Sequence, residues 1–322
     1  MIRALEAVSA VLYPLVIVAM LAGFGWTGLQ WLMSHGDSPV PVPVAGVCAV
    51  ATLLLSGWLC ERLVPLAALS PQRWIYHERP RRRLRGLDEV SLVQVAAFLL
   101  AGLFLGVATG WLVQFTLLGP AARLLPALRR RYRLPDLLRA GRTRLVGSSP
   151  WAVQDSEMVA DALAATWLRR VGTGVSTSRA ALFLRRLRRR SYLLIIAVIL
   201  LLGGVALAPL GPGPFILGWG VLGAGLYRCA DVSRLRPDRL WIPVLAGHGL
   251  LAALVVWGIW GANPAATAAA VVFIAYRRGQ PRRVITYATV DSGFGISTSP
   301  GLSDYYLRGL VVGTLLAALT YL

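Results

Sequence analysis

Two ionisable residues, His248 and Glu61, lie in or beside apolar runs of membrane-spanning length, and both could do chemistry there. An ionisable group at membrane depth is costly to bury and is a candidate functional residue by default. His248 is flanked by Gly247 and Gly249, and the intrinsic pKa of histidine suits substrate binding or proton relay. Each residue also has a structural interpretation. His248 could be a neutral histidine bonded to a neighbouring helix, and Glu61 could form an interfacial ion pair with Arg62.

A stretch rich in hydroxyl and carboxyl side chains, 284–306, is the second place where chemistry could occur. It begins with strand-like alternation, and its later glycines and Pro300 exclude a long helix. A serine hydrolase would need a positioned base, for which His248 is the only candidate in an apolar run. We therefore expect a structured loop or a partner contact, with a gating or ligand-binding loop as the alternative and catalysis last. The candidate functional residues are Asp291, Ser292, Gly293, Gly295, Ser297, Ser299 and Asp304.

Three further patterns resemble known sites but lack the context that those sites need. Residues 218–223 match the glycine spacing of dinucleotide-binding loops, but they lie inside an apolar run, where small residues favour close helix packing. Residues 77–81 begin like the zinc-protease helix motif, but Arg81 replaces the second histidine and Pro80 disfavours a helix. The three cysteines are too far apart for a local metal pair. The sequence predicts no metal and no cofactor.

The composition indicates the class of protein to which these candidate residues belong. The chain has 322 residues, of which 57% are hydrophobic and 15% charged, whereas soluble domains are about 45–50% apolar and about 25% charged. It is arginine-rich: all 33 basic residues are arginine, and with 14 acidic residues they give a net charge of +19. Three cysteines exclude a disulfide scaffold, and the hydrophobicity excludes a disordered chain.

Apolar runs of about 20 residues are long enough to cross a hydrocarbon core of about 30 Å as helices. We therefore expect an all-α polytopic integral membrane bundle, with about seven full spans, one re-entrant or short helix, and cytoplasmic amphipathic helices. Its first run is expected to be retained rather than cleaved as a signal peptide. The runs cover residues 8–33, 44–63, 92–118, 191–210, 215–227, 241–260, 265–276 and 306–322.

Arginine placement predicts the orientation of the spans, because cytoplasmic loops collect basic residues near span ends. Segments 62–91, 119–190, 228–240 and 277–283 carry seven, sixteen, four and four arginines. The connections at 34–43, 211–214 and 261–264 carry none. We therefore expect a cell-membrane protein whose basic loops are cytoplasmic and whose C-terminus lies outside.

The apolar run 92–118 complicates this orientation, since one full crossing would put its two arginine-rich flanks on opposite sides. The favoured resolution is a re-entrant or bent run, which its glycines, Gly110 among them, would permit. The alternatives are an N-terminus outside the cell or a translocated segment 119–190.

The expected organisation is an N-terminal membrane segment (1–118), a basic cytoplasmic helical region (119–190), and a C-terminal bundle (191–322) with a cytoplasmic loop 277–305. The basic region is predicted to contain an amphipathic helix over 154–171. A second helix is predicted from about Ser178, carrying its arginines directly into the following apolar run.

The basic clusters indicate an anionic partner. Lipid headgroups are favoured, because each arginine near a membrane surface contributes about 1 kcal/mol. A cytoplasmic protein with an acidic face is a second possibility, and nucleic acid is less favoured because few aromatic residues interleave the arginines. The candidate binding residues are Arg81, Arg82, Arg83, Arg129, Arg130, Arg131, Arg185, Arg186, Arg188, Arg189 and Arg190.

The sequence predicts three possible functions, which we give in order of preference. The first is a non-enzymatic component of a transport, export or other membrane-associated assembly, which docks a partner or anionic lipid through its arginine-rich face. The alternative is a scaffold that recruits nucleic acid or protein. An intramembrane enzyme is third, because it would need His248, Glu61 and the loop 291–304 to converge.

Overall fold

The computed structural model describes residues 39–68, 89–138, 140–141, 179–230, 240–280, 290–291, 297–298 and 309–321. Within these ranges the regular secondary structure is helical, apart from two two-residue strands, β1 (Val290–Asp291) and β2 (Ser297–Thr298). The predicted all-α class is thereby confirmed. The predicted run 8–33 and the predicted helix 154–171 lie outside the described residues.

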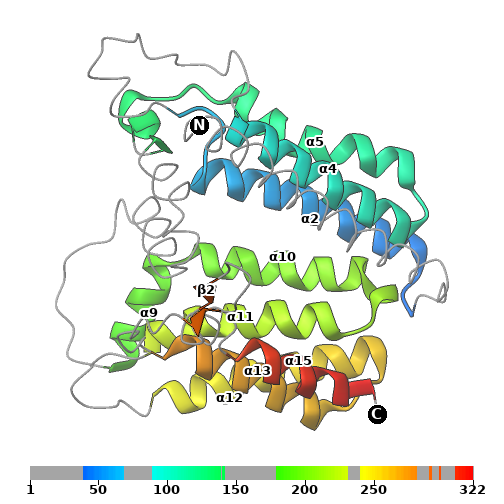
Figure 1. The fold of residues 1–322 in the computed structure, drawn as a ribbon, viewed down its shortest axis with the longest axis vertical. Coiled ribbons are helices and arrows are strands. Elements are labelled where there is room, and N and C mark those ends of the chain that lie inside the picture. The colour runs from blue at the N-terminus through cyan, green and yellow to red at the C-terminus, as the bar shows by residue number, and fades with distance from the viewer. Residues whose placement is uncertain are drawn as a thin grey trace.

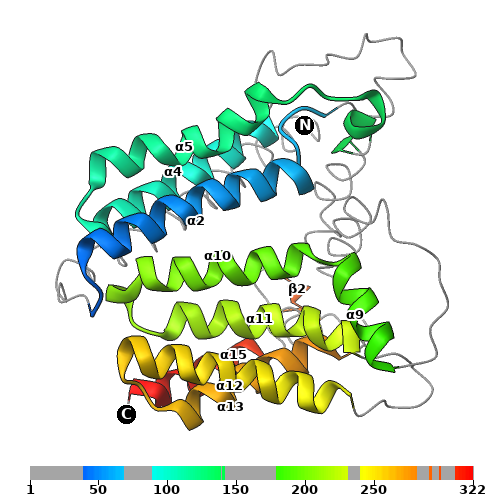
Figure 2. The same cartoon turned by 180° about the vertical axis from the view of Figure 1, so that it is seen from behind.

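The helices form two groups that pack side by side (Figure 1). The first group contains α2 (Val42–Leu63), α4 (Glu89–Thr109) and α5 (Leu112–Arg129). The second contains α10 (Tyr192–Ala206), α11 (Gly213–Ala230), α12 (Trp241–Trp260), α13 (Pro264–Gly279) and α15 (Leu310–Ala318). Helix α2 faces α10 across the junction of the groups, as the front and back views both show (Figures 1 and 2).

The apolar run 92–118 is divided into two helices that form an antiparallel hairpin. The break lies at Gly110, whose φ of 74° is a backbone conformation that glycine adopts without strain. Beyond it, α5 returns along α4 so closely that a Cβ on Gly102 would lie 2.2 Å from the carbonyl oxygen of Phe115. As expected, the chain turns back and ends this hairpin at the end of the bundle from which α4 starts. The break at Gly110 agrees with the expected bend in this run, and the second arm extends beyond the run because α5 continues through residue 118 to Arg129.

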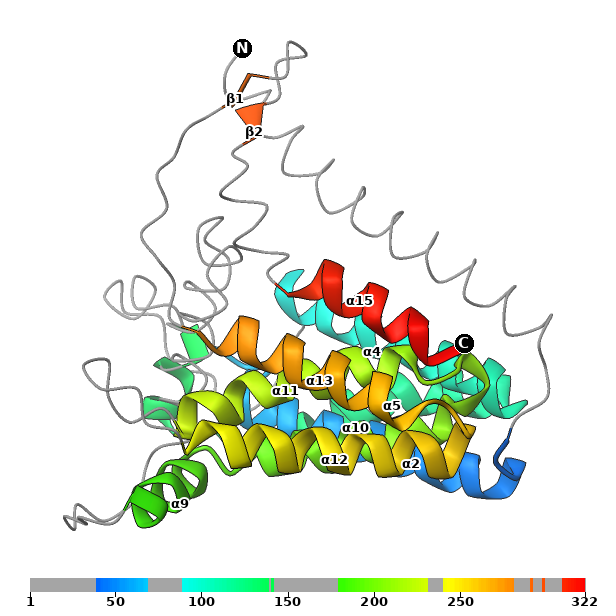
Figure 3. The same ribbon diagram turned by 90° about the horizontal axis from the view of Figure 1, so that it is seen from below.

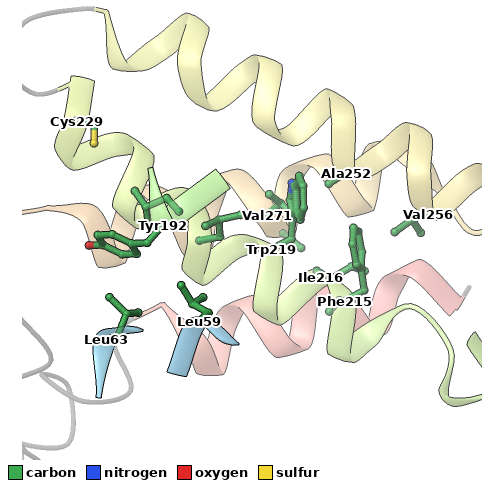
Figure 4. Packing of buried hydrophobic residues seen from close by; sticks show 14 residues of the cluster. Leu59, Leu63, Tyr192, Phe215, Ile216, Trp219, Cys229, Ala252, Val256 and Val271 are labelled. Carbon is green, nitrogen blue, oxygen red and sulfur yellow. The ribbon is translucent and has the colours of Figure 1, made fainter. Parts of the chain in front are cut away.

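A buried apolar core joins the two helix groups (Figure 4). Phe215, Ile216 and Trp219 of α11 lie at its centre, and the rings of Phe215 and Trp219 stack with centroids 5.3 Å apart. Leu59 and Leu63 of α2 complete the core from the first group. The same apolar surface therefore fixes the last turn of α2 against the second group.

Arginine-bearing helix termini gather at one end of the bundle, which we call the arginine end. The C-terminal ends of α2, α5, α11 and α13 lie there, with the N-terminal ends of α10 and α12. For example, Tyr227 packs against Gly279 of α13 and Trp241 of α12. The opposite end carries the turns 110–111, 211–212 and 261–263, which contain no arginine. The described arginines are thus separated along the bundle as the sequence pattern predicts.

Helix α9 (Arg179–Arg189) confirms the helix predicted from about residue 178. It does not run straight into the next helix, because its axis and that of α10 differ by 73°. Phe183 packs against the apolar core, while Leu184 on the same helix is 61% exposed. The bend turns α9 across the arginine end, away from the direction of the other helices (Figures 1 and 2).

Three described helices are long and apolar enough to cross a membrane: α2, residues Ser91–Thr109 of α4, and α12. A fourth qualifies if α9 and α10 count as one broken span. Helices α10, α13 and α15 have 15, 16 and 9 residues, short of the about 20 that a span needs. Figure 3 shows the short α15 lying against α13. The expectation of about seven full spans is not confirmed, although these apolar helices are those of a membrane-embedded protein.

Candidate functional site

Glu61 is at the centre of a buried polar network at the arginine end. It lies in the last turn of α2 and is only 2% exposed. Its carboxylate oxygen Oε2 accepts hydrogen bonds from Nη1 of Arg123 over 2.8 Å and from the backbone N–H of Leu66 over 3.1 Å. A buried carboxylate loses the solvation of water, and hydrogen bonds and opposite charges compensate for that loss.

Arg123 reaches the network from α5 and is fully buried. Besides Glu61, it donates from Nη2 to the carbonyl oxygen of Val64 over 2.7 Å and from Nε to Oε1 of Gln94 over 3.1 Å. Gln94 belongs to α4, so one guanidinium bonds to α2, to the segment after it, and to α4. The planar fork of arginine suits this multiple bonding.

Two residues that follow α5 bond to the other oxygen of the Glu61 carboxylate. Tyr132 donates its hydroxyl to Oε1 over 2.8 Å, and Nη1 of Arg130 lies 3.3 Å from the same oxygen. Arg130 also donates to the backbone carbonyl of Glu61 over 2.6 Å. Burial, followed by the charge of Glu61, raises the pKa of the Tyr132 hydroxyl above its ordinary value, so that Tyr132 remains a hydrogen-bond donor.

Close packing of α2 on α5 brings these groups together. Gly57 lies one turn before Glu61, and a Cβ there would be 2.0 Å from the carbonyl oxygen of Ala122. That carbonyl would normally bond to the N–H four residues later, but residue 126 is proline and has none. The carbonyl oxygen of Ala122 on α5 therefore faces Gly57, the position of α2 that has no side chain. This contact lies next to Arg123.

The structure corrects the partner that we predicted for Glu61. The carboxylate pairs with Arg123 and Arg130, whereas the guanidinium of Arg62 lies over the ring of Trp58, 5.5 Å from its centroid. The bonds to Glu61 tie the hairpin and the segments after α2 and α5 into one unit. The network is therefore a structural brace, with its charges already paired inside the protein.

His248, the other predicted polar residue, is buried between α12 and α11. Its Nε2 lies 2.8 Å from the carbonyl oxygen of Trp219, and its ring stacks on the Trp219 indole with centroids 5.0 Å apart. The Trp219 Nε1 donates in return to the carbonyl oxygen of His248 over 3.2 Å. Gly223 makes room for the ring, because a Cβ there would lie 2.9 Å from Nε2. This contact matches the structural interpretation, a histidine bonded to a neighbouring helix.

Gly218, Gly220 and Gly223 lie inside α11, and the helix context rules out a dinucleotide-binding turn. A Cβ on Gly220 would lie 2.8 Å from Ile274 of α13, so these glycines permit close helix packing.

The serine- and aspartate-rich loop is described only at its two strands. Asp291 lies opposite Ser297 in the antiparallel ladder, and Val290 lies opposite Thr298. This pairing agrees with a structured loop. The other candidate residues of the loop lie outside the described residues, namely Ser292, Gly293, Gly295, Ser299 and Asp304.

The predicted binding arginines divide into three sets. Arg81, Arg82 and Arg83 lie outside the described residues. Arg129, Arg130 and Arg131 follow one another at the end of α5, where Arg130 contacts Glu61. The third set, Arg185, Arg186, Arg188, Arg189 and Arg190, lies on α9 and in the bend before α10.

Part of this third set lines a recess of about 370 Å³, which we call the arginine recess. Its lining residues are Arg186, Arg189, Arg190, Arg228 and Cys229. Arg228 comes from the last turn of α11, and its Nη2 donates to the carbonyl oxygen of Arg278 over 3.1 Å. Four guanidinium groups from two helices therefore converge on one space.

Sequence reasoning missed Arg123, Gln94, Tyr132 and Arg228. A signal for Arg123 was present, since it is a single charge between prolines in the otherwise apolar stretch 112–128. Among the described residues, no group of three or more histidine, cysteine or acidic side chains is arranged to hold a metal ion. Comparison with protein family models, curated proteins and solved structures found no match to this chain.

Proposed function

We propose that this multi-pass membrane protein is a non-enzymatic component of a membrane-associated assembly, and that its arginine end docks on anionic lipid headgroups at the cytoplasmic surface. One observation carries the proposal: α9, rich in arginine, turns by 73° from the apolar α10. Helices that lie in the membrane interface combine a basic face with apolar contacts. Phe183, packed on the core, supplies such a contact for α9.

The charge distribution supports the cytoplasmic assignment of the arginine end. Basic residues are retained on the cytoplasmic side, and that leaflet carries the anionic lipids. The turns at the opposite end carry no arginine. Helix α15 begins at the arginine end, where Gly309 packs against Arg277, so it leads the chain toward the opposite end. The proposal therefore places the C-terminus outside the cell.

A pair of reporter fusions tests this orientation. Alkaline phosphatase, which is active only outside the cytoplasm, is expected to be active when fused after Leu322. The matched fusion after Gln280, at the arginine end, is expected to be inactive. Activity in the second fusion and not in the first would reverse the proposed orientation.

Chemical labelling tests the docking itself. The full chain is reconstituted in phosphatidylcholine vesicles with or without phosphatidylglycerol, and exposed arginines are modified with phenylglyoxal. We expect phosphatidylglycerol to slow modification of Arg185 and Arg188, as followed by mass spectrometry. Equal rates in both vesicles would contradict docking on anionic lipid. Protection that appears only with an added acidic protein or oligonucleotide would favour the scaffold alternative.

The enzyme hypothesis receives no support from the described residues. The Glu61 carboxylate is paired with two arginines, and the Nε2 of His248 is bonded to the Trp219 carbonyl. These contacts are those of groups that stabilise helix packing.

A further inference from the structure

The chain that follows α5 presents alternate side chains to opposite sides. Arg130 is extended, with a φ of −81° and a ψ of 130°. Arg130 and Tyr132 turn inward to the Glu61 carboxylate, and the Arg130 guanidinium lies 5.3 Å from the centroid of the Tyr132 ring. Successive side chains of an extended segment point to opposite sides. Arg131 and Arg133 are accordingly exposed, whereas Tyr132 between them is buried.

Three exposed arginines occur where α5 ends, and we call them the outer arginines: Arg129, Arg131 and Arg133. Among the described residues, the ion pairs are those that Glu61 forms with Arg123 and Arg130. The outer arginines therefore form no ion pair with a described carboxylate. Asp136, which follows them in the next helical turn, still leaves this stretch with a net positive charge. Arginine keeps its charge at every physiological pH, so the outer arginines form a permanent positive patch.

The register of the α4–α5 hairpin places this patch just beyond the apolar part of α4. Three contacts define the register: Gly102 with Phe115, Phe98 with Gly119, and Gln94 with Arg123. Each step of four residues toward the start of α4 is thus matched by four residues toward the end of α5. The stretch of α4 that is apolar enough to cross a membrane begins at Ser91, which is level with residue 126 in this register. Arg129 therefore lies about 4.5 Å farther out along the helix axis.

This position corresponds to the depth of the lipid headgroups, which extend about 5–7 Å beyond each side of the hydrocarbon core. The segment after α5 does not leave this level at once, because Arg130 and Tyr132 stay bonded to Glu61 in the last turn of α2. The outer arginines are therefore held where phospholipids carry their phosphate groups. Since the backbone is already fixed by the Glu61 network, less conformational entropy is lost on binding.

Exposed apolar side chains on α5 lead up to the outer arginines. Leu117 and Leu128 are 70% and 58% exposed. Leu125, also exposed, precedes Arg129 by four residues and so is its neighbour on the helix surface. In a membrane-embedded bundle this face contacts acyl chains, and a phospholipid lying there brings its phosphate to the arginines. A soluble anion would meet the arginines but leave the leucines uncovered, so the combination favours a lipid.

We propose that the outer arginines bind the phosphate groups of anionic phospholipids that lie against α5. Guanidinium groups suit this ligand, because they bind phosphate oxygens with paired, charge-assisted hydrogen bonds. The inference rests on the proposed docking function and adds a second lipid contact, on the first helix group. The contact through α9 is separate from it, because α9 packs on α11 in the second group (Figure 1).

Photocrosslinking tests the proposed site locally. The full chain is reconstituted in phosphatidylcholine vesicles with a trace of phosphatidylglycerol or phosphatidylcholine that carries a diazirine in one acyl chain. After illumination, mass spectrometry measures crosslinks to α5 and to α9 separately. The ratio of phosphatidylglycerol to phosphatidylcholine crosslinks gives the local enrichment of anionic lipid, which we expect to exceed one at both helices.

Two variants that remove the same charge separate the two contacts. Arg131→Gln/Arg133→Gln removes two outer arginines, and the matched control Arg185→Gln/Arg188→Gln removes two arginines from α9. An arginine near a membrane surface contributes about fivefold to the affinity for anionic lipid, equivalent to about 1 kcal/mol. After partial screening by salt, the first variant should lower the enrichment at α5 by about tenfold and leave that at α9 unchanged. The second variant should have the opposite pattern.

A lysine pair guards against an effect of altered folding. Arg131→Lys/Arg133→Lys keeps both charges but loses the planar fork of the guanidinium group. Its enrichment at α5 should lie between those of the wild type and the glutamine pair. Circular dichroism and gel filtration confirm that each variant remains folded. An enrichment as low as that of the glutamine pair would show that charge does not account for binding, and would overturn the proposal.

Each remaining outcome has a distinct meaning. Unchanged enrichment at α5 in the glutamine pair would overturn the outer-arginine site, while docking through α9 would stand if phosphatidylglycerol remains enriched there. No enrichment at either helix would overturn both proposals. An equal fall at α5 in both glutamine variants would indicate general surface charge and overturn a site at the outer arginines. Loss of enrichment at α5 on addition of inorganic phosphate, at constant ionic strength, would assign the arginines to a soluble phosphate. Loss on addition of an acidic peptide would assign them to a protein partner, and either result would overturn the lipid assignment.

Discussion

Two arginine clusters at the same end of the bundle have opposite organisations. Around Glu61, Arg123 and Arg130 share one carboxylate, and Arg123 has no exposed surface. In the arginine recess, four guanidinium groups converge, with no carboxylate among the described lining residues. The first arrangement pairs its arginines with a described carboxylate, and the second brings guanidinium groups from α9, the bend after it and α11 to one space. Arginine in this chain therefore occurs in two different structural settings at the same end of the bundle.

The largest effect should come from breaking the Glu61 network. Arg123→Met leaves the Glu61 carboxylate buried with one partner fewer, and we expect a loss of about 3–5 kcal/mol in the free energy of unfolding. The measurement is denaturation of the purified chain in detergent. Arg62→Gln is the control, because Arg62 lies over Trp58 outside the network, and it should cost less than about 1 kcal/mol.

The double variant Glu61→Met/Arg123→Met sharpens this result. It should be more stable than Arg123→Met alone, because replacing both buried charges with apolar groups removes the unpaired one. A double variant less stable than either single one would show that Glu61 and Arg123 contribute independently.

The next largest effect should come from separating the two helices that carry the network. Gly57→Ala places a methyl group 2.0 Å from the carbonyl oxygen of Ala122, and the forced shift should cost about 2–3 kcal/mol. Gly258→Ala is the matched control, since a Cβ there meets nothing within 4 Å. In a helix that change should be neutral or stabilise by up to about 1 kcal/mol. Equal losses would argue against close α2–α5 packing.

A smaller effect, of about 1–2 kcal/mol, is expected from Tyr132→Phe, which removes one donor to Glu61. The pH dependence has a definite sign. The pKa of Tyr132 is raised above its ordinary value of 10.0 in the folded chain, so above that pH the unfolded state releases a proton that the folded state retains. The stability contributed by Tyr132 should therefore fall as the pH rises above 10.0. Alkaline unfolding curves that fall equally in Tyr132→Phe would contradict this.

The smallest effect should come from the recess. Without anionic lipid, Arg189→Gln should change the free energy of unfolding by less than about 0.5 kcal/mol, because it removes a charge that faces other positive charges. Thermal unfolding in neutral detergent measures it. A loss comparable with that of Arg123→Met would mean that the recess is a structural brace as well, and the contrast between the clusters would disappear.

Local patterns predicted the parts of the fold that depend on neighbouring residues. The bounds Trp241–Trp260 are those expected for the sixth apolar run, and Asn263 caps α13 by accepting from the N–H groups of Ala265 and Ala266. Residues 241–260 form one apolar run that only His248 interrupts, so the bounds of the helix follow from the ends of the run.

Long-range pairing could not be predicted in the same way. Glu61 and Arg123 are 62 residues apart, and their contact depends on the turn at Gly110 and the close approach at Gly57. The apolar run 92–118 contains several glycines and no charge, so the sequence allowed a bend but did not indicate at which glycine the chain would turn. The arginine recess likewise requires the 73° bend between α9 and α10, which no periodicity within either helix indicates.

The order of Glu61 and Arg123 along the chain has a consequence for biosynthesis. Translation produces α2 with its carboxylate before it produces the α4–α5 hairpin with the matching guanidinium. A solitary arginine entering an apolar environment is strongly disfavoured, but here its counter-ion has already emerged from the ribosome. The hairpin can thus pack on α2 as a charge-neutral unit, and the nascent chain avoids exposing Arg123 while later helices are still being made.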